Sequence, residues 1–190
     1  MTTVPAHTRT AEAIRRVTDL GAALVILVGL SWLLIAIWLL VRLTSRGPGL
    51  FAQVRVGRQQ APFTCYKFRT MRTGTPHAAT HEIPPDATTR LGRFLRRTKL
   101  DELPQAWNLL RGEMTLVGPR PCLPVQHALI AERQRRGVFA LKPGLTGLAQ
   151  IRNVDMRDPV RLARLDAQYQ LARSCSGDVQ ILWRTFFRSA

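Results

Sequence analysis

The sequence predicts an α+β protein that is mostly helical, with an N-terminal membrane helix, a short β-hairpin and a small domain with interfacial amphipathic helices. Three observations support this fold class. The stretch 20–41 holds 22 residues without a charge. Two short runs of strand-forming residues, 50–56 and 63–71, are joined by turn residues. From residue 90 onward, apolar residues recur at helical spacing. We therefore expect a mobile N-terminus (1–14), a membrane helix (15–45) and a cytoplasmic domain (46–190).

The uncharged stretch is long enough to cross a bilayer, because 22 helical residues rise ~33 Å. It is too long for the apolar core of a signal peptide. Arginines lie on both sides of it, at 15, 16, 42 and 46. Since positive charge favours the cytoplasmic side, a spanning and a re-entrant topology both stay open. Gly29 and Ser31 near its middle favour a bend around residues 29–32, so we expect the re-entrant form.

The chain is strongly basic, with 28 Lys and Arg against 12 Asp and Glu. Such a chain could bind nucleic acid, a membrane surface or phosphorylated substrates. The sequence holds no zinc-finger spacing, ribonucleoprotein aromatic signature or basic zipper, so we do not expect nucleic acid. Beside an apolar anchor, anionic lipid and phosphate are the better partners. Cys65, Cys122 and Cys175 are odd in number and widely spaced, which indicates reduced thiols.

The domain begins with the expected hairpin and a Pro-rich loop at 73–89. A short helix follows within 89–98, with Leu91, Phe94 and Leu95 on its inner face. A second helix is expected from about residue 101. Its apolar positions are Leu100, Leu103, Trp107 and Leu110.

Two adjacent acids, Asp101 and Glu102, fall at the start of that second helix, since Pro104 is tolerated only in a first turn. The helix dipole and neighbouring arginines are expected to lower the pKa of Asp101 and keep it ionised. An ionised carboxylate suits a metal ligand or a nucleophile, and the helix start with its arginines suits phosphate. The plainer alternative is a helix cap or a solvated surface pair.

Two further helices are expected towards the C-terminus. In the helix at 158–172, Leu162, Leu165 and Tyr169 point inward, and Asp166 lies on the same apolar side. The last helix places Val179, Leu182, Trp183 and Phe186 on one face. It resembles an interfacial amphipathic helix, although a plain core helix is nearly as well supported.

Taken together, these motifs resemble those of the bacterial sugar transferases, also called monotopic polyprenyl-phosphate phosphoglycosyl transferases. The resemblance runs from about Arg15 to Phe187. It begins with Arg15, Arg16 and Asp19 before the apolar helix. It continues through "SRGPGLFAQVRVG", "YKFRTM", "LGRFLRRTKLDELPQAWNLLRGEMTLVGPRP", "LKPGLTGLAQ" and "LDAQY". The long central motif is the most specific of these.

This resemblance implies an enzyme of the bacterial inner membrane, with its catalytic domain on the cytoplasmic face. It implies transfer of a sugar 1-phosphate from a nucleotide diphosphate sugar, in particular a UDP-sugar, to polyprenyl (undecaprenyl) phosphate. Such a reaction initiates the synthesis of exopolysaccharide or another glycoconjugate. A homodimer is a further partner that we keep open.

The resemblance also implies roles for individual residues. Asp101 would be the nucleophile, would hold a covalent phosphosugar and would contact Mg²⁺, and Glu102 would assist it. Arg96, Arg120 and Lys67 would contact substrate phosphate.

The chain differs from the family pattern in three places. Trp32 stands after Ser31 where the family has proline, and Glu113 stands where it has Asp. The family's Gly-Arg after the Thr-Gly motif is missing, so Arg152 and Arg157 are the candidates for nucleotide binding. Two other interpretations stay open. One is a membrane-anchored, non-catalytic relative that binds nucleotide sugar or scaffolds a glycan assembly complex, and the other is a membrane-tethered nucleic-acid binder.

Overall fold

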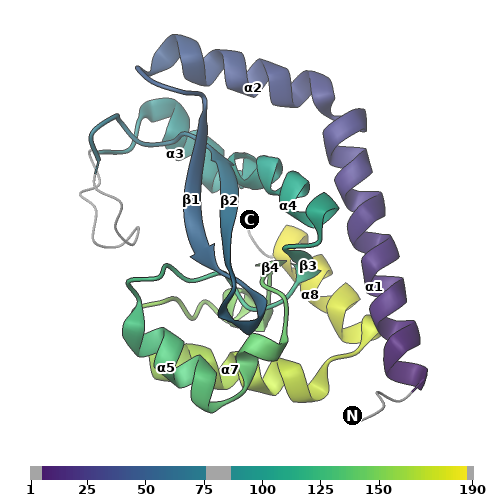
Figure 1. Cartoon of the computed structure of the whole chain (residues 1–190). Coiled ribbons are helices and arrows are strands. Elements are labelled where there is room, and N and C mark those ends of the chain that lie inside the picture. The colour runs from purple at the N-terminus through teal and green to yellow at the C-terminus, as the bar shows by residue number, and fades with distance from the viewer. Residues whose placement is uncertain (1–5, 76–86, 188–190) are drawn as a thin grey trace.

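A computed structural model describes residues 6–75 and 87–187 as a mostly helical α+β fold (Figure 1). Residues 1–5 and most of the loop expected at 73–89 lie outside the described residues. Helix α1 (Ala6–Leu24), a π-helical turn (Val25–Gly29) and α2 (Ser31–Thr44) lead into β1 (Leu50–Val56) and β2 (Pro62–Phe68). The rest comprises α3 (Arg90–Arg97), a 3-10 helix η5 (Leu100–Gln105), α4 (Ala106–Arg111), β3 (Thr115–Val117), α5 (His127–Arg135), β4 (Gly144–Thr146), α6 (Leu148–Ile151), α7 (Pro159–Ala172) and α8 (Cys175–Phe187), with short 3-10 turns at Arg58–Gln60 and Val138–Ala140.

The expected apolar helix is a bent pair that begins at Ala6 rather than at residue 15. Thr10–Gly29 and Ser31–Thr44 meet at 63°. Figure 1 shows α1 running along one side of the domain and α2 crossing its end. Of the described helices, none is long and apolar enough to cross a membrane alone. The bent pair taken together has the length and composition to do so.

The bend lies at the π-helical turn, where the Leu30 amide donates to the Val25 carbonyl oxygen at 3.0 Å. A π-helical turn carries an additional residue and commonly interrupts an α-helix. Gly29 ends the turn, and Ser31 starts α2. The bend therefore forms without proline and at the edge of the expected range 29–32.

Helix α1 is held on the domain by the Arg-Arg-x-x-Asp motif. The Arg16 guanidinium donates to the carbonyl oxygens of Leu109 and Leu110 at 2.6 and 2.8 Å. These carbonyls lie at the C-terminal end of α4, where helical partners are missing and a cation is favoured. The Asp19 carboxylate accepts from the Leu116 amide at 2.8 Å. These side chains fasten α1 to α4 and β3.

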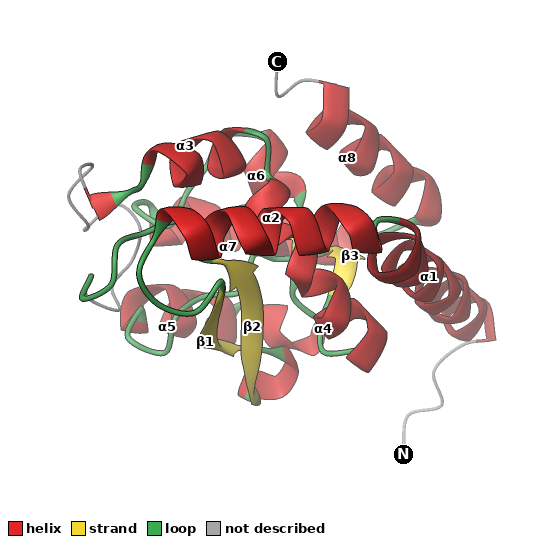
Figure 2. Cartoon of the chain, turned by 90° about the horizontal axis from the view of Figure 1, so that it is seen from above, coloured by secondary structure: helices red, strands yellow, loops and turns green. Residues whose placement is uncertain are grey.

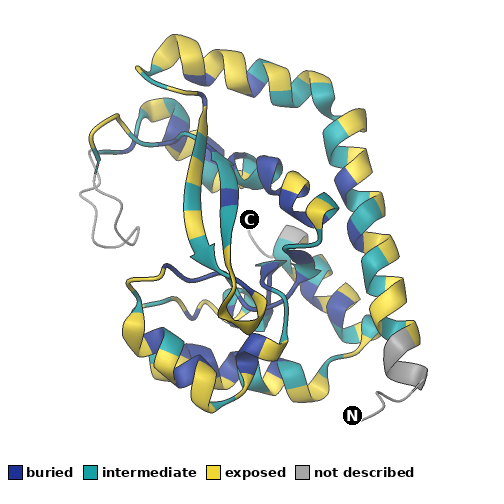
Figure 3. Ribbon diagram, in the orientation of Figure 1, coloured by how far each residue is buried: buried dark blue, intermediate teal, exposed yellow. Residues whose placement is uncertain are grey.

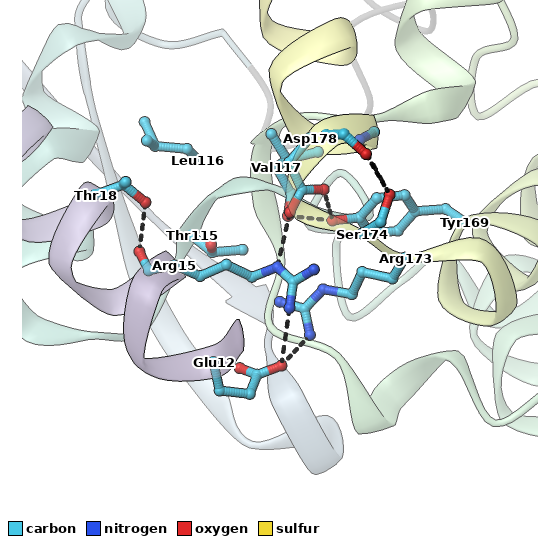
Figure 4. A network of polar contacts seen from close by, with 12 residues as sticks. Glu12, Arg15, Thr18, Thr115, Leu116, Val117, Tyr169, Arg173, Ser174 and Asp178 are labelled. Atoms are coloured by element: carbon cyan, nitrogen blue, oxygen red, sulfur yellow. Dashed lines mark hydrogen bonds and ion pairs between the residues drawn. The ribbon is translucent and has the colours of Figure 1, made fainter. Parts of the chain in front are cut away.

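Arg15 connects α1 to the last helix (Figure 4). Its Nε donates to Asp178 of α8 at 2.7 Å, and the Tyr169 hydroxyl bonds the other Asp178 oxygen at 2.7 Å. Arg173 pairs with Glu12 of α1 close by. The arginines before the apolar stretch, which we treated as topology signals, are thus engaged with the domain.

Two small sheets frame the centre of the molecule. Strands β1 and β2 form the predicted antiparallel hairpin, with Leu50 opposite Phe68, and β2 ends three residues earlier than expected. Strands β3 and β4 pair in parallel, which the sequence did not predict. A Cβ on Gly144 would lie 2.1 Å from the Gly118 amide nitrogen. Gly118 and Gly144 therefore cannot be replaced by a larger residue, because the backbones of their two loops are in contact.

The observed burial of individual residues tests which helix faces were correctly predicted to point inward (Figure 3). The predicted inner residues of α7, including Asp166, are buried, and α2 packs Ile37 and Val41 against Phe68 and Leu95. Figure 2 shows α2 lying across the hairpin. Phe94, which we placed on the inner face of α3, is 48% exposed, so that placement is wrong. Trp107, one of the apolar positions at helical spacing in the next helix, is 46% exposed.

Helix α8 forms as expected, but only part of its predicted face is inward. Val179 and Trp183 are exposed, Leu182 is half-buried and Ile181 is buried. The side chain of Phe186 lies outside the described residues. All three cysteines are free thiols, as predicted.

Candidate active site

A pocket of about 1270 Å³ lies between the hairpin, η5 and the C-terminal part of α8. Its walls include Asp101 and Glu102 and a large share of basic side chains, among them Lys67, Arg96, Arg120 and Arg152. Six of the seven predicted site residues therefore line one cavity. Arg157 is not among the lining residues, and its Nε lies 3.5 Å from an Asp155 carboxylate oxygen.

The acidic pair sits at the start of a helix, although that first segment is 3-10 rather than α. Lys99 precedes it with a positive φ of 58°, which turns the chain sharply after α3. Pro104 falls inside η5, and α4 continues from Ala106. Asp101 is only 7% exposed and faces the pocket.

Within the Asp101–Glu102 dyad, Glu102 is the residue that forms ion pairs. Its Oε1 accepts from Lys67 Nζ at 2.7 Å and from Arg120 Nη2 at 2.8 Å. These two cations hold the pKa of Glu102 well below its usual range, although burial opposes them. Glu102 therefore stays ionised and fixes the two cations at the pocket wall.

Asp101 is the unpaired member, since none of the ion pairs in the described ranges reaches it. Burial raises the pKa of Asp101, and the charge of Glu102 raises it further. Lys67, Arg96 and Arg120 lower it by less. The expectation that the pKa of Asp101 lies below its ordinary value is therefore wrong, because removal from water outweighs the lowering effect of the cations.

Arg96 is positioned beside the dyad without touching it. Its Nε donates to the Thr70 hydroxyl at 2.9 Å. Burial lowers the pKa of Arg96 from its ordinary value, while the charge of Asp101 acts in the opposite direction. A guanidinium keeps its charge under such conditions, so Arg96 presents a cation to the pocket.

The loop that carries Arg120 is fixed by three successive carbonyl groups. The carbonyl oxygen of Arg120 accepts from Arg133 Nη1 at 2.9 Å, and that of Pro121 accepts from Arg55 Nη1 at 3.1 Å. The Cys122 carbonyl oxygen accepts from the Val56 amide at 3.0 Å. This loop cannot shift without breaking contacts to two other elements, so it aims Arg120 at Glu102.

Arg133 is itself held by Asp166, through two hydrogen bonds of 2.9 and 2.8 Å. Both side chains are almost fully buried. Sequence reasoning missed Arg133 and Arg55 as supports of the site. The available signal was Asp166 on an apolar helix face, since a buried carboxylate needs a cationic partner.

A metal ion can be accommodated here only with help from substrate. Within the described part of the chain, no three His, Cys, Asp or Glu residues converge. Asp101, which forms no ion pair within residues 6–75 and 87–187, faces the pocket. Mg²⁺ commonly takes one or two carboxylates together with substrate phosphate oxygens, so the donor set fits a site that phosphate completes.

An Asp-Glu pair among arginines, with Asp101 buried and Glu102 half-buried in the wall of a large pocket, defines a site suited to phosphorylated ligands. The chain belongs to the bacterial sugar transferase family, whose model matches residues 10–190.

Curated relatives extend this assignment. The chain is 40% identical to an undecaprenyl-phosphate glucose phosphotransferase of Komagataeibacter xylinus, over 92% of this chain and 35% of that protein. It is 39% identical to a UDP-glucose:undecaprenyl-phosphate glucose-1-phosphate transferase of Caulobacter vibrioides, over 90% of this chain and 67% of the relative. An uncharacterized sugar transferase, EpsL of Bacillus subtilis, is 38% identical over 90% of this chain and 85% of its own length. The chain thus spans about a third of the first relative and most of the third.

Proposed function

We propose that this protein transfers a sugar 1-phosphate from a nucleotide diphosphate sugar, in particular a UDP-sugar, to polyprenyl phosphate. The observation that carries the proposal is the difference in ion pairing between Asp101 and Glu102. Glu102 is neutralised by Lys67 and Arg120, whereas Asp101 faces the pocket and makes no ion pair with another described residue. The names of the relatives from Komagataeibacter and Caulobacter support the same reaction.

In the first step, the Asp101 carboxylate attacks the phosphorus that bears the sugar. A bond forms between this phosphorus and an Asp101 oxygen, and the bond to the bridging oxygen breaks. The nucleoside monophosphate leaves with that oxygen. In the second step, an oxygen of polyprenyl phosphate attacks the same phosphorus, and the Asp101 carboxylate is released. The product is a polyprenyl diphosphate sugar.

The cations around the dyad allow an anionic nucleophile to approach an anionic substrate. Lys67 and Arg120 are fixed by Glu102, so they are in place before substrate binds. Arg96 adds a third positive charge beside Asp101. Because Lys67 and Arg120 both donate to Glu102 and hold its pKa well below the usual range, we assign it the positioning of these cations. Mg²⁺, held by Asp101 and substrate oxygens, would neutralise further phosphate charge.

The bent helix pair supports a re-entrant anchor in the bacterial inner membrane, with the pocket on the cytoplasmic face. Both arms return to the domain. Arg15, Arg16 and Asp19 fasten the first arm, and Ile37 and Val41 pack the second. Outward-facing apolar residues on the pair, including Val28, Trp32 and Leu43, are 66–82% exposed in this structure and would contact lipid.

The reaction is tested by offering purified protein a panel of radiolabelled nucleotide sugars with undecaprenyl phosphate and Mg²⁺. We expect one nucleotide sugar to release its nucleoside monophosphate and to label the lipid. Without lipid, intact-mass analysis should find the sugar phosphate on the protein. Asp101→Asn should stay folded and lose both signals. A variant that retained more than a few per cent of turnover would remove Asp101 from this role. Binding of nucleotide sugar without monophosphate release would instead identify a non-catalytic relative.

A further inference from the structure

The C-terminal part of α8 forms one wall of the pocket. Arg184 and Thr185 line the cavity together with Lys99, which lies two residues before Asp101. Lys99 Nζ donates to the Thr185 carbonyl oxygen at 3.3 Å. The hydroxyl groups of Thr185 and Thr146 lie 2.7 Å apart. This wall is therefore fixed to the turn that carries the nucleophile and to strand β4.

The same helix exposes an apolar stripe. Val179, Trp183 and Phe187 recur every four residues and are 64%, 62% and 63% exposed, so they share one face of the helix. The rings of Trp183 and Phe187 are stacked, with centroids 3.9 Å apart. Arg184 directly follows Trp183 in the chain. A basic pocket wall and an exposed apolar face thus adjoin on one helix.

This combination matches only one of the two substrates. A nucleotide sugar is polar along its whole length, so it would gain little free energy by covering an exposed apolar stripe. A polyprenyl phosphate ends in a phosphate monoester that carries close to two negative charges at neutral pH, and the rest of it is hydrocarbon. Arginine can bind such a phosphate through two parallel N–H groups, and the hydrocarbon gains free energy by covering apolar side chains.

We propose that Arg184, with Lys99 beside it, binds the phosphate of the polyprenyl phosphate acceptor. The prenyl chain leaves the pocket along the stripe formed by Val179, Trp183 and Phe187. This inference rests on the proposed function and assigns the acceptor its own subsite. Lys67, Arg120 and Arg96, near the dyad, remain for the donor. The acceptor oxygen then reaches the phosphorus on Asp101 from the α8 side of the pocket.

The test separates the two half-reactions in Arg184→Gln. In neutral detergent, the burst of nucleoside monophosphate from donor alone should stay within about twofold of the unaltered protein. The KM for undecaprenyl phosphate should rise roughly tenfold or more, as expected for loss of a charged hydrogen-bond donor. Arg184→Lys should recover part of this loss. Arg164→Gln, on an exposed position of α7 outside the pocket, is the matched control and should change neither value.

Three outcomes would overturn the assignment. An unchanged acceptor KM would exclude Arg184 from acceptor binding. Equal losses in the donor burst and in acceptor transfer would place Arg184 in the donor site. An effect seen only in vesicles that contain anionic lipid would assign it to bilayer headgroups.

A binding measurement tests the subsite without turnover. Farnesyl phosphate and farnesol are titrated into the protein in neutral detergent, with no donor present, and tryptophan fluorescence is recorded. We expect the phosphate to bind more tightly than the alcohol, and Arg184→Gln to abolish this difference. If the protein shows the preference but never releases a monophosphate, the proposed reaction fails and the lipid-phosphate subsite stands. If no preference is found although turnover is normal, the subsite alone is wrong.

Discussion

At the scale of single residues, two adjacent carboxylates have opposite electrostatic environments. Glu102 accepts from two cations, while Asp101 is buried beside the negative charge of Glu102. The identities of both residues and their place at a helix start could be predicted from the sequence. The direction of the pKa shift of Asp101 could not be predicted. It depends on how far the fold removes Asp101 from water and on which of the two carboxylates pairs with Lys67 and Arg120.

The pH dependence of the first half-reaction should report this arrangement. In the proposed reaction Asp101 attacks as the carboxylate, so activity should fall as the pH drops through its raised pKa, and kcat/KM should show an acidic limb. Glu102→Gln removes a charge that raises this pKa, so the limb should move to lower pH. Lys67→Met removes a charge that lowers it, so the limb should move to higher pH.

The rate of nucleoside monophosphate release from the donor would be measured across the acidic pH range for each variant. The residual activity of each variant is enough to locate its acidic limb. Arg164→Gln serves as the control and should leave the limb in place. Movement of both variants in the same direction would contradict the electrostatic assignment.

At the scale of elements, hydrophobic spacing predicted the helices better than it predicted their inner faces. In α7 the spacing correctly predicted that Leu162, Leu165 and Tyr169 are buried. In α3, Phe94 and Leu95 are neighbours, and spacing alone cannot decide which one meets the core. The parallel pairing of β3 and β4 joins segments about thirty residues apart, and no local pattern encodes such a contact. The supports of the Arg120 loop are equally non-local.

The Arg133–Asp166 pair offers a test of these supports. Arg133→Met leaves a buried carboxylate unpaired and should lower the free energy of unfolding by about 3–5 kcal/mol. Adding Asp166→Leu should restore most of that stability, because no buried charge remains. Activity should stay low in the double variant, since the Arg120 carbonyl group has still lost its donor.

Thermal unfolding in detergent and kcat/KM for both half-reactions would be compared across the two single variants and the double variant. Arg133→Lys should recover some activity if position is what matters. A double variant with full activity would show that the pair contributes only stability.

At the scale of the whole molecule, the N-terminal arm and the pocket that holds Asp101 and Glu102 are one connected structure. Arg15 joins α1 to α8, and α8 forms a wall of the pocket. The sequence predicted an apolar anchor with positive flanks, but left its topology open. The contacts made by these flanks favour the re-entrant form, because both arms are tied to the same domain.

Cysteine labelling in intact cells tests this topology. With the native cysteines replaced, Thr3→Cys and Thr8→Cys should react with an impermeant thiol reagent only after the membrane is opened. A cysteine at Arg164, within the domain, is the control for the cytoplasmic side. Labelling of Thr3→Cys or Thr8→Cys from outside would show that the segment spans the membrane.

The π-helical turn at Val25–Gly29 also has a consequence for how this anchor can change during evolution. Such a turn holds one residue more than the α-helical turn that it replaces, so deleting a single codon there would restore α-helical hydrogen bonding. The same deletion would reduce the bend of 63° between Thr10–Gly29 and Ser31–Thr44, because a π-helical turn is a place where a helix axis changes direction. The face of α2 that now meets Phe68 and Leu95 would then turn away from them. A single codon in this turn therefore influences whether the second arm reaches the hairpin, and a lineage could weaken that contact without changing any residue of α2.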